Sequence, residues 1–294
     1  MMATPKNSAI GPRRSGEIAG WDVLRWRNGP PRSGAVDSLS RFCFHSLLLI
    51  TSLSTLTFAE VFAAGAESDS NRFHRVYLEF KGHSQKQTND AEAAWQYARA
   101  CFDWADFAVN DKQRSAIADE GIAASRKAIV LEPKAAGGYY YLGLNLGQSA
   151  QTKMLGALKL IDAMEEAWTK TIELDAKFDF AGAHRSLTLL YRDAPGWPTS
   201  VGSRSKARLH IQKALELCPE YPGNQICWLE SQIKWGETKA VRTQIAAVEE
   251  RLKAARLKFT GEQWARDWEE WDEKLQKIKA KIGVVPARSP RHAP

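Results

Sequence analysis

Histidine is the side chain that most readily serves as a metal ligand or a general base near neutral pH, and this chain contains six. None of those after residue 66 has a second ligand at the spacing that would place both on one face of a helix. The chain contains no H-E-x-x-H sequence, no G-x-S-x-G nucleophile elbow, no Walker phosphate loop and no dinucleotide fingerprint. The sequence therefore predicts a protein that is not an enzyme and that holds no metal and no cofactor. A hydrolase whose reactive residues meet from distant helices is the catalytic alternative.

Three cysteines follow residue 66, namely Cys101, Cys218 and Cys227. Each falls on a predicted apolar helix face, where a small buried thiol is the ordinary interpretation. An odd number of cysteines cannot complete a disulfide framework. A bridge between Cys218 and Cys227, which flank a single turn, stays open as an alternative.

The net charge of +7 would attract nucleic acid if it were concentrated on one surface. Residues 1–66 account for three of these charges, which leaves +4 for the remaining residues. No arginine-rich helix face stands out in those residues. We therefore expect no nucleic-acid partner.

The strongest pattern in the chain is a repeat of constant length. Ala128, Thr171 and Ala214 occupy the same position of a short motif, and successive copies are 43 residues apart. The copies are Arg126–Pro133, Thr169–Ala176 and Gln212–Pro219. A constant period of this size is typical of stacked helical hairpins, each of which buries its apolar face against its neighbours.

Apolar residues recur at three- and four-residue steps through residues 90–283, and no segment alternates as a strand would. We expect an all-α, right-handed solenoid of about four helical hairpins with a C-terminal capping helix. Trp264, Trp268 and Trp271 form a stripe on that last helix, and an oligomerisation helix is the alternative interpretation. The hairpins are predicted at 91–131, 137–172, 181–217 and 225–257, and the last helix at 262–282.

The N-terminal region resembles an export signal. Residues 41–66 combine Arg41, an apolar core and the small residues Ala63 to Ala66, the order of a cleaved secretory signal. Retention as a membrane anchor is the alternative, but the core is short for a bilayer, and we expect no stable membrane insertion after cleavage. Residues 1–40 are predicted to be a disordered or mis-called extension, 67–89 a flexible segment and 284–294 a disordered tail.

The repeat resembles the tetratricopeptide consensus. Leu142-Gly143 takes the Leu-Gly position of a first helix, and Ala207, Ile211, Ala214 and Pro219 take the positions of a second. The long segments 137–147 and 193–203 are similar to those of exported bacterial tetratricopeptide proteins related to the TRAP-transporter T-component family. That resemblance implies a periplasmic solenoid, a trimer as its homo-oligomer, and association with the solute-binding protein of a small-molecule importer.

In a tetratricopeptide hairpin the first helix lines the concave side, so outward positions on the first helices become candidates for contact with a partner. Arg185 and Arg192 would suit an acidic peptide tail or a small carboxylate, although both could instead pair with acids on adjacent helices. Trp197, in a loop stiffened by two prolines, is either a partner contact or a plug over the next hairpin. The predicted partner-binding residues are Tyr140, Asn145, Gln148, Arg185, Arg192, Trp197, Asn224, Ser231 and Lys234.

These patterns favour a non-catalytic periplasmic scaffold that binds a protein or peptide partner, with an importer's solute receptor as the candidate implied by the resemblance. A general envelope assembly factor that grips extended peptides is the first alternative. A small-ligand chamber formed by the long inter-helix turns is the second.

Overall fold

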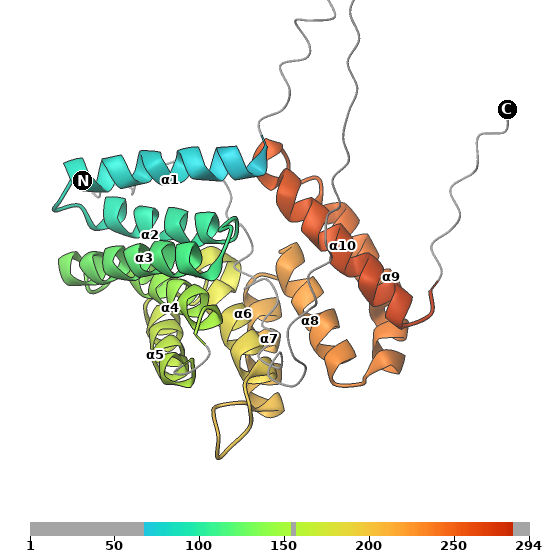
Figure 1. Ribbon diagram of the computed structural model, residues 1–294. Helices are drawn as coiled ribbons and strands as arrows, with labels where there is room; N and C mark the ends of the chain where they lie inside the picture. Colours follow the sequence, from blue (N-terminus) through green and yellow to red (C-terminus); the bar gives the residue numbers. More distant parts are fainter. Residues whose placement is uncertain (1–67, 154–156, 285–294) are drawn as a thin grey trace, which may run out of the picture.

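The computed structural model describes residues 68–153 and 157–284. Within these residues the chain is an α-solenoid without strands, in which each helix packs on its neighbours in sequence (Figure 1). The predicted fold class is therefore confirmed. The helices are α1 (Asp69–Lys86), α2 (Ala91–Ala105), α3 (Asp111–Leu131), α4 (Ala136–Gln151), α5 (Leu158–Asp175), α6 (Phe178–Asp193), α7 (Arg204–Leu217), α8 (Pro222–Lys234), α9 (Thr238–Ala255), the short 3₁₀ helix η2 (Glu262–Trp264) and α10 (Ala265–Lys281).

Four hairpins follow the 43-residue repeat: α2–α3, α4–α5, α6–α7 and α8–α9. The repeated position lies at the centre of the packing, because Ala128, Thr171 and Ala214 are all fully buried, one in each of α3, α5 and α7. The first hairpin begins at the predicted cap, where Asp90 accepts hydrogen bonds from the backbone N–H groups of the first turn of α2. Small residues at the repeated position let the second helices approach their neighbours closely.

One glycine shows how close that approach is. A Cβ atom at Gly143 of α4 would lie 2.6 Å from Cε2 of Trp168 in α5, well inside van der Waals contact. Trp168 is fully buried and donates its indole N–H to the carbonyl oxygen of Tyr140, 3.3 Å away. The Leu-Gly position of the repeat is therefore a steric requirement of the α4–α5 contact.

The helix α6 begins with a left-handed turn. Asp179, Phe180 and Ala181 have φ angles of 54°, 55° and 60°, a region that costs about 1–2 kcal/mol per residue for side chains other than glycine. Packing compensates for this strain, since the Phe180 ring stacks on Tyr221, the N-cap residue of α8, with centroids 4.5 Å apart. The right-handed part of α6 then starts near residue 181, where the sequence placed the helix.

The last helix closes the C-terminal end of the array. Trp264, Trp268 and Trp271 are at most 9% exposed and belong to a cluster with residues of α8 and α9. This burial agrees with the predicted capping helix, because the tryptophan stripe that would serve oligomerisation is covered within the chain. The helix is preceded by η2, so its regular part starts three residues later than expected.

Residues 67–89, predicted to be flexible, instead contain the helix α1. Ser68 caps it, and the Tyr77 hydroxyl donates a 2.8 Å hydrogen bond to Glu120 of α3. The prediction was wrong because it overlooked a short apolar stripe in this polar segment, Phe73, Val76, Tyr77 and Phe80, which recurs at helical steps and packs on the first hairpin.

The two ends of the array meet (Figure 1). Arg266, at the start of α10, forms an ion pair of 2.5 Å with Asp69, at the start of α1, and its guanidinium lies 4.9 Å from the ring centroid of Phe107. Residues 197 positions apart in the sequence are thus adjacent. The solenoid therefore curves far enough for its first and last described helices to touch.

The predicted extension 1–40 and signal 41–66 lie outside the described residues, as does all but Val284 of the predicted tail 284–294. Among the described helices, none combines the length and the apolar character that a membrane crossing needs.

Candidate functional site

The predicted partner-binding residues of α4 join this helix to the first hairpin. Asn145 donates hydrogen bonds to the carbonyl oxygens of Ala98 in α2 and Tyr141, at 2.9 and 2.8 Å. The Gln148 amide donates to Asp106, 2.7 Å away, and accepts a 2.6 Å hydrogen bond from Arg114 of α3. Both side chains therefore connect consecutive hairpins.

A buried polar cluster joins α4, α6 and α8 in the same way. The Tyr140 hydroxyl donates a 2.6 Å hydrogen bond to Asp179, and burial, followed by the Asp179 charge, raises the pKa of Tyr140 well above its usual value. Arg185 donates to Oδ1 of Asn224 at 3.0 Å and forms an ion pair of 3.5 Å with Asp179. Its guanidinium also lies 5.0 Å from the ring centroid of Tyr221. Every charge and amide here has a partner on another turn or helix.

The third group links the ends of α6 and α8. Arg192 makes two 2.8 Å hydrogen bonds to the carboxylate of Asp193 and a 3.3 Å hydrogen bond to Ser231. Lys234 of α8 forms an ion pair of 2.5 Å with the same carboxylate. Arg185 and Arg192 therefore pair with Asp179 and Asp193 of their own helix, and not with acids on adjacent helices as the alternative interpretation expected.

These residues form a polar ladder between the first helices of successive hairpins. Six of the predicted residues, Tyr140, Asn145, Gln148, Arg185, Asn224 and Ser231, are 0% exposed. Because they lie between helices, they do not form an open wall that a partner could reach. Their role in partner binding stays a prediction, and their visible role is to fix the spacing of the hairpins.

Trp197 is the exception, because its side chain is 89% exposed. It lies in the turn between α6 and α7, where Gly196 and Gly202 form an isolated bridge. The side chain does not plug the next hairpin, and its contact with a partner stays a prediction.

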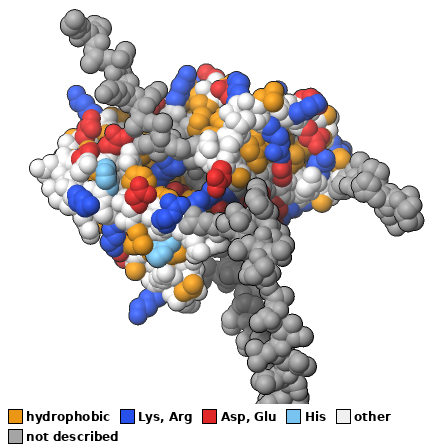
Figure 2. Space-filling view, turned by 90° about the horizontal axis from the view of Figure 1, so that it is seen from above, with side chains coloured by type: hydrophobic (Ala, Val, Ile, Leu, Met, Phe, Trp, Pro, Cys, Tyr) orange, Lys and Arg blue, Asp and Glu red, His pale blue; other side chains and the backbone are white. Residues whose placement is uncertain are grey.

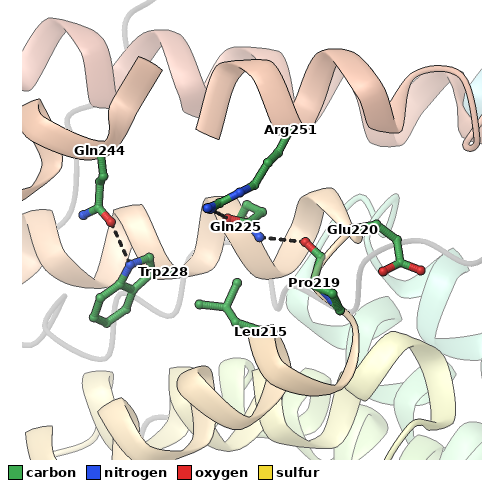
Figure 3. A pocket seen from close by; sticks show the side chains of 7 residues that line it. All are labelled: Leu215, Pro219, Glu220, Gln225, Trp228, Gln244 and Arg251. Atoms are coloured by element: carbon green, nitrogen blue, oxygen red, sulfur yellow. Dashed lines mark hydrogen bonds between the residues drawn. The ribbon is translucent and has the colours of Figure 1, made fainter. Parts of the chain in front are cut away.

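A more accessible site is a groove on α7, α8 and α9, which we call the outer groove (Figure 3). It has a volume of about 520 Å³, within the range of small-ligand sites. Its wall on one side comes from α7 and the turn that follows, its floor from α8 and its other wall from α9. The lining residues are Leu215, Pro219, Glu220, Gln225, Trp228, Gln244 and Arg251.

The outer groove exists because α8 differs from α4 at one repeat position. When Leu142-Gly143 is matched with Leu229-Glu230, Gln225 takes the place of Gly138. A Cβ atom at Gly138 would lie 3.0 Å from the Ile129 side chain of α3, so the glycine permits close packing on the preceding helix. A glutamine in this position holds α7 away, and α7 packs much less extensively on α8 than α3 does on α4.

Two glutamine amides give the outer groove its hydrogen-bonding character. Gln225 donates to the carbonyl oxygen of Pro219 at 2.7 Å and accepts from Arg251 at 3.4 Å. Gln244 accepts a 3.2 Å hydrogen bond from the indole of Trp228 and donates to Gln232. A glutamine amide has two N–H donors and two acceptor positions, so each retains one donor and one acceptor beyond these bonds. That combination matches the N–H and C=O groups of a peptide backbone. Gln225 is buried, so the half-buried Gln244 is the amide that a ligand reaches.

These lining residues were not predicted from the sequence. A signal for them was available, because the replacement of a repeat glycine by Gln225 marks a place where two helices cannot pack closely. Arg251 carried no such signal, since an exposed arginine on a helix is common.

No group suited to covalent or metal chemistry stands out in the described part of the chain. Cys101, Cys218 and Cys227 are free thiols, so the Cys218–Cys227 bridge does not form in this structure. Burial raises the pKa of all three, that of Cys227 to about 11, which keeps them protonated at neutral pH. Among residues 68–153 and 157–284, no three histidine, cysteine or acidic side chains are grouped to hold a metal.

Figure 2 shows one face of the molecule, on which basic and acidic side chains are interspersed with apolar ones. A nucleic-acid surface would instead gather one sign of charge. The described side chains of this face therefore give no support to a nucleic-acid partner.

The fold and these sites define an α-solenoid held together by a polar ladder, with an open groove on α7, α8 and α9. In a comparison with family models, residues 56–180 match Regulator of microtubule dynamics protein 1-3. A search of the curated proteins found no match. The family match overturns the predicted relationship to exported tetratricopeptide proteins of the TRAP T-component type. The helical repeat misled that prediction, because a Leu-Gly pair and small residues at helix contacts are demands of close packing that unrelated helical arrays share.

Proposed function

We propose that the chain is a non-catalytic helical-repeat scaffold that binds an extended segment of a partner protein in the outer groove. The observation that carries this proposal is the half-buried Gln244 amide, which is hydrogen-bonded to the Trp228 indole and retains one donor and one acceptor. An extended peptide can pair its backbone with such an amide while one apolar side chain packs on the indole and on Leu215. Arg251, which is exposed, adds a guanidinium for an acidic side chain.

The proposal is tested by selecting peptides from a random display library on the full-length chain and measuring the affinity of the enriched sequences. Arg251→Glu should weaken these peptides about tenfold or more, because it removes a charge-assisted hydrogen bond and adds a repulsive charge. Arg126→Glu is the matched control, since Arg126 is an exposed arginine of α3 far from the groove in the repeat. If both reversals weaken binding equally, or neither does, the outer groove is not the binding site.

A second candidate follows from the family match. The matched family is described as regulators of microtubule dynamics, and a scaffold that binds tubulin or a protein on microtubules would agree with that description. The rate of tubulin polymerisation, followed by turbidity with and without the full-length chain, tests it. An unchanged rate at saturating chain concentration would remove this candidate and leave the peptide-binding scaffold standing.

Export through residues 41–66 stays a proposal of the same kind. Fractionation of cells that express the chain with a C-terminal tag, together with the mass of the purified product, shows whether a segment ending near Ala66 is removed.

A further inference from the structure

Two histidines face each other across the third hairpin. Nδ1 of His184 on α6 and Nδ1 of His210 on α7 are 3.0 Å apart, and His184 is only 7% exposed. At this distance one nitrogen carries the proton and donates it, and the other must be unprotonated to accept it. When both nitrogens carry protons, two N–H groups point at each other and the contact is lost.

The surroundings disfavour positive charge on this pair. Burial, followed by the charges of His210 and Lys213, lowers the pKa of His184 to about 4. Burial and Lys206 also lower the pKa of His210, while Glu165 of α5 acts in the opposite direction. The pair is therefore neutral at pH 7.

The nearby carboxylate is already engaged. Glu165 accepts hydrogen bonds from the Tyr191 hydroxyl and from Lys206, which lies 3.3 Å away. Lys206 also lies 4.8 Å from the ring centroid of Tyr191. Since Glu165 is shared between these two groups, it offers little compensation for a second positive charge on the histidines.

The position of the pair connects it with the outer groove. His210 belongs to α7, and Leu215 of the same helix lines the groove. Because α7 packs weakly on α8, its contact with α6 is what mainly holds this wall in place. A loss of the histidine contact would weaken that hold, to which the apolar packing of Leu189 on Ile211 and Ala214 also contributes.

We propose that His184 and His210 form an acid-sensitive latch that holds α7 against α6 at neutral pH and loosens it, with the wall of the outer groove, in mild acid. The direction of this pH effect follows from the linkage between proton binding and folding. Both groups have lowered pKa values in the folded chain, so the unfolded chain binds more protons, and the stabilisation present above about pH 6.5 is lost as the pH falls toward 4. The consequence for ligand binding rests on the proposed function of the groove, whereas the latch itself does not.

Hydrogen exchange of the full-length, ligand-free chain at pH 7 and pH 5 tests the latch. A shift from about 6.5 to about 4 in the buried His184 changes the opening equilibrium roughly twentyfold between pH 7 and pH 5. Protection factors, which remove the intrinsic pH dependence of exchange, should fall by that amount in α6 and α7 and stay constant in α9. In His184→Gln/His210→Gln, whose amides do not titrate, the fall should be absent.

The proposal is overturned if the double variant shows the same fall, or if the wild type shows none. Should the double variant fail to fold, NMR titration of the two imidazole rings in the wild-type chain decides. Rings that both titrate near 6.5 would contradict the latch, and rings that titrate well below would support it. The latch and its effect on the outer groove are separate claims, and peptide affinity at pH 7 and pH 5 tests the second. Weaker binding at pH 5 supports the link to the groove, and equal binding refutes that link alone.

Discussion

Replacement of Arg185 by methionine distinguishes a structural from a partner-binding role for the polar ladder. The guanidinium is fully buried, donates to Asn224 at 3.0 Å and to the Phe180 carbonyl oxygen at 3.4 Å, and pairs with Asp179 at 3.5 Å. Methionine fills much of the same volume but provides none of these donors. The variant would leave a buried carboxylate without its cation.

Removing one member of a buried ion pair typically costs 3–5 kcal/mol. We expect the lower end, about 3 kcal/mol, because the Tyr140 hydroxyl still donates a 2.6 Å hydrogen bond to Asp179. For a chain of this size that corresponds to a melting temperature lower by about 6–12 °C. Asp179→Asn in the same background should recover about 1–2 kcal/mol of this loss, since the two charges interact directly.

Urea unfolding followed by circular dichroism at 222 nm measures these changes for the single and double variants. Arg251→Met is the matched control, and it should change the free energy of unfolding by less than about 0.5 kcal/mol because this arginine is exposed. An Arg185→Met variant as stable as the wild type, or one that shows no coupling with Asp179→Asn, would refute the structural role of the ladder.

Three further substitutions test other parts of the structure. Gly143→Ala should destabilise the chain by about 1–3 kcal/mol in urea unfolding, because its Cβ would overlap the buried Trp168 ring. Trp197→Ala should leave the free energy of unfolding within about 0.5 kcal/mol of the wild type, and a larger loss in thermal melts would show that the exposed indole packs on the chain. Arg266→Ala should cost less than about 1 kcal/mol globally, yet speed amide exchange at the start of α1, where Asp69 loses its bond to α10 and keeps its bond to Arg72. Unchanged exchange there would contradict closure of the array.

The hairpins could be predicted because the residues that produce them lie close together in the sequence and recur at a fixed interval. Ala128, Thr171 and Ala214 recur at one interval, and a small residue at each helix contact is visible in the sequence. The helix α1 lies outside the 43-residue repeat, so the repeat did not mark it. Its own apolar stripe, from Phe73 to Phe80, is short and stands in a polar segment.

The candidate site was harder to predict, because it depends on which side of a first helix is covered. Arg192 and Asn224 carry polar groups in positions that look outward on an isolated hairpin, yet neighbouring first helices cover them. The outer groove results from a difference between repeats, Gln225 in place of Gly138, rather than from a conserved spacing. Tertiary packing of this kind leaves only a weak trace in one sequence.

The central claim is that a partner occupies the outer groove while the polar ladder only joins the hairpins. Hydrogen exchange of the full-length chain with and without a selected peptide tests this claim most directly. Slower exchange at Leu215, in the turn after α7 and in the first turn of α8 is the predicted result. Slower exchange confined to α2, α4 and the middle of α6 would contradict it.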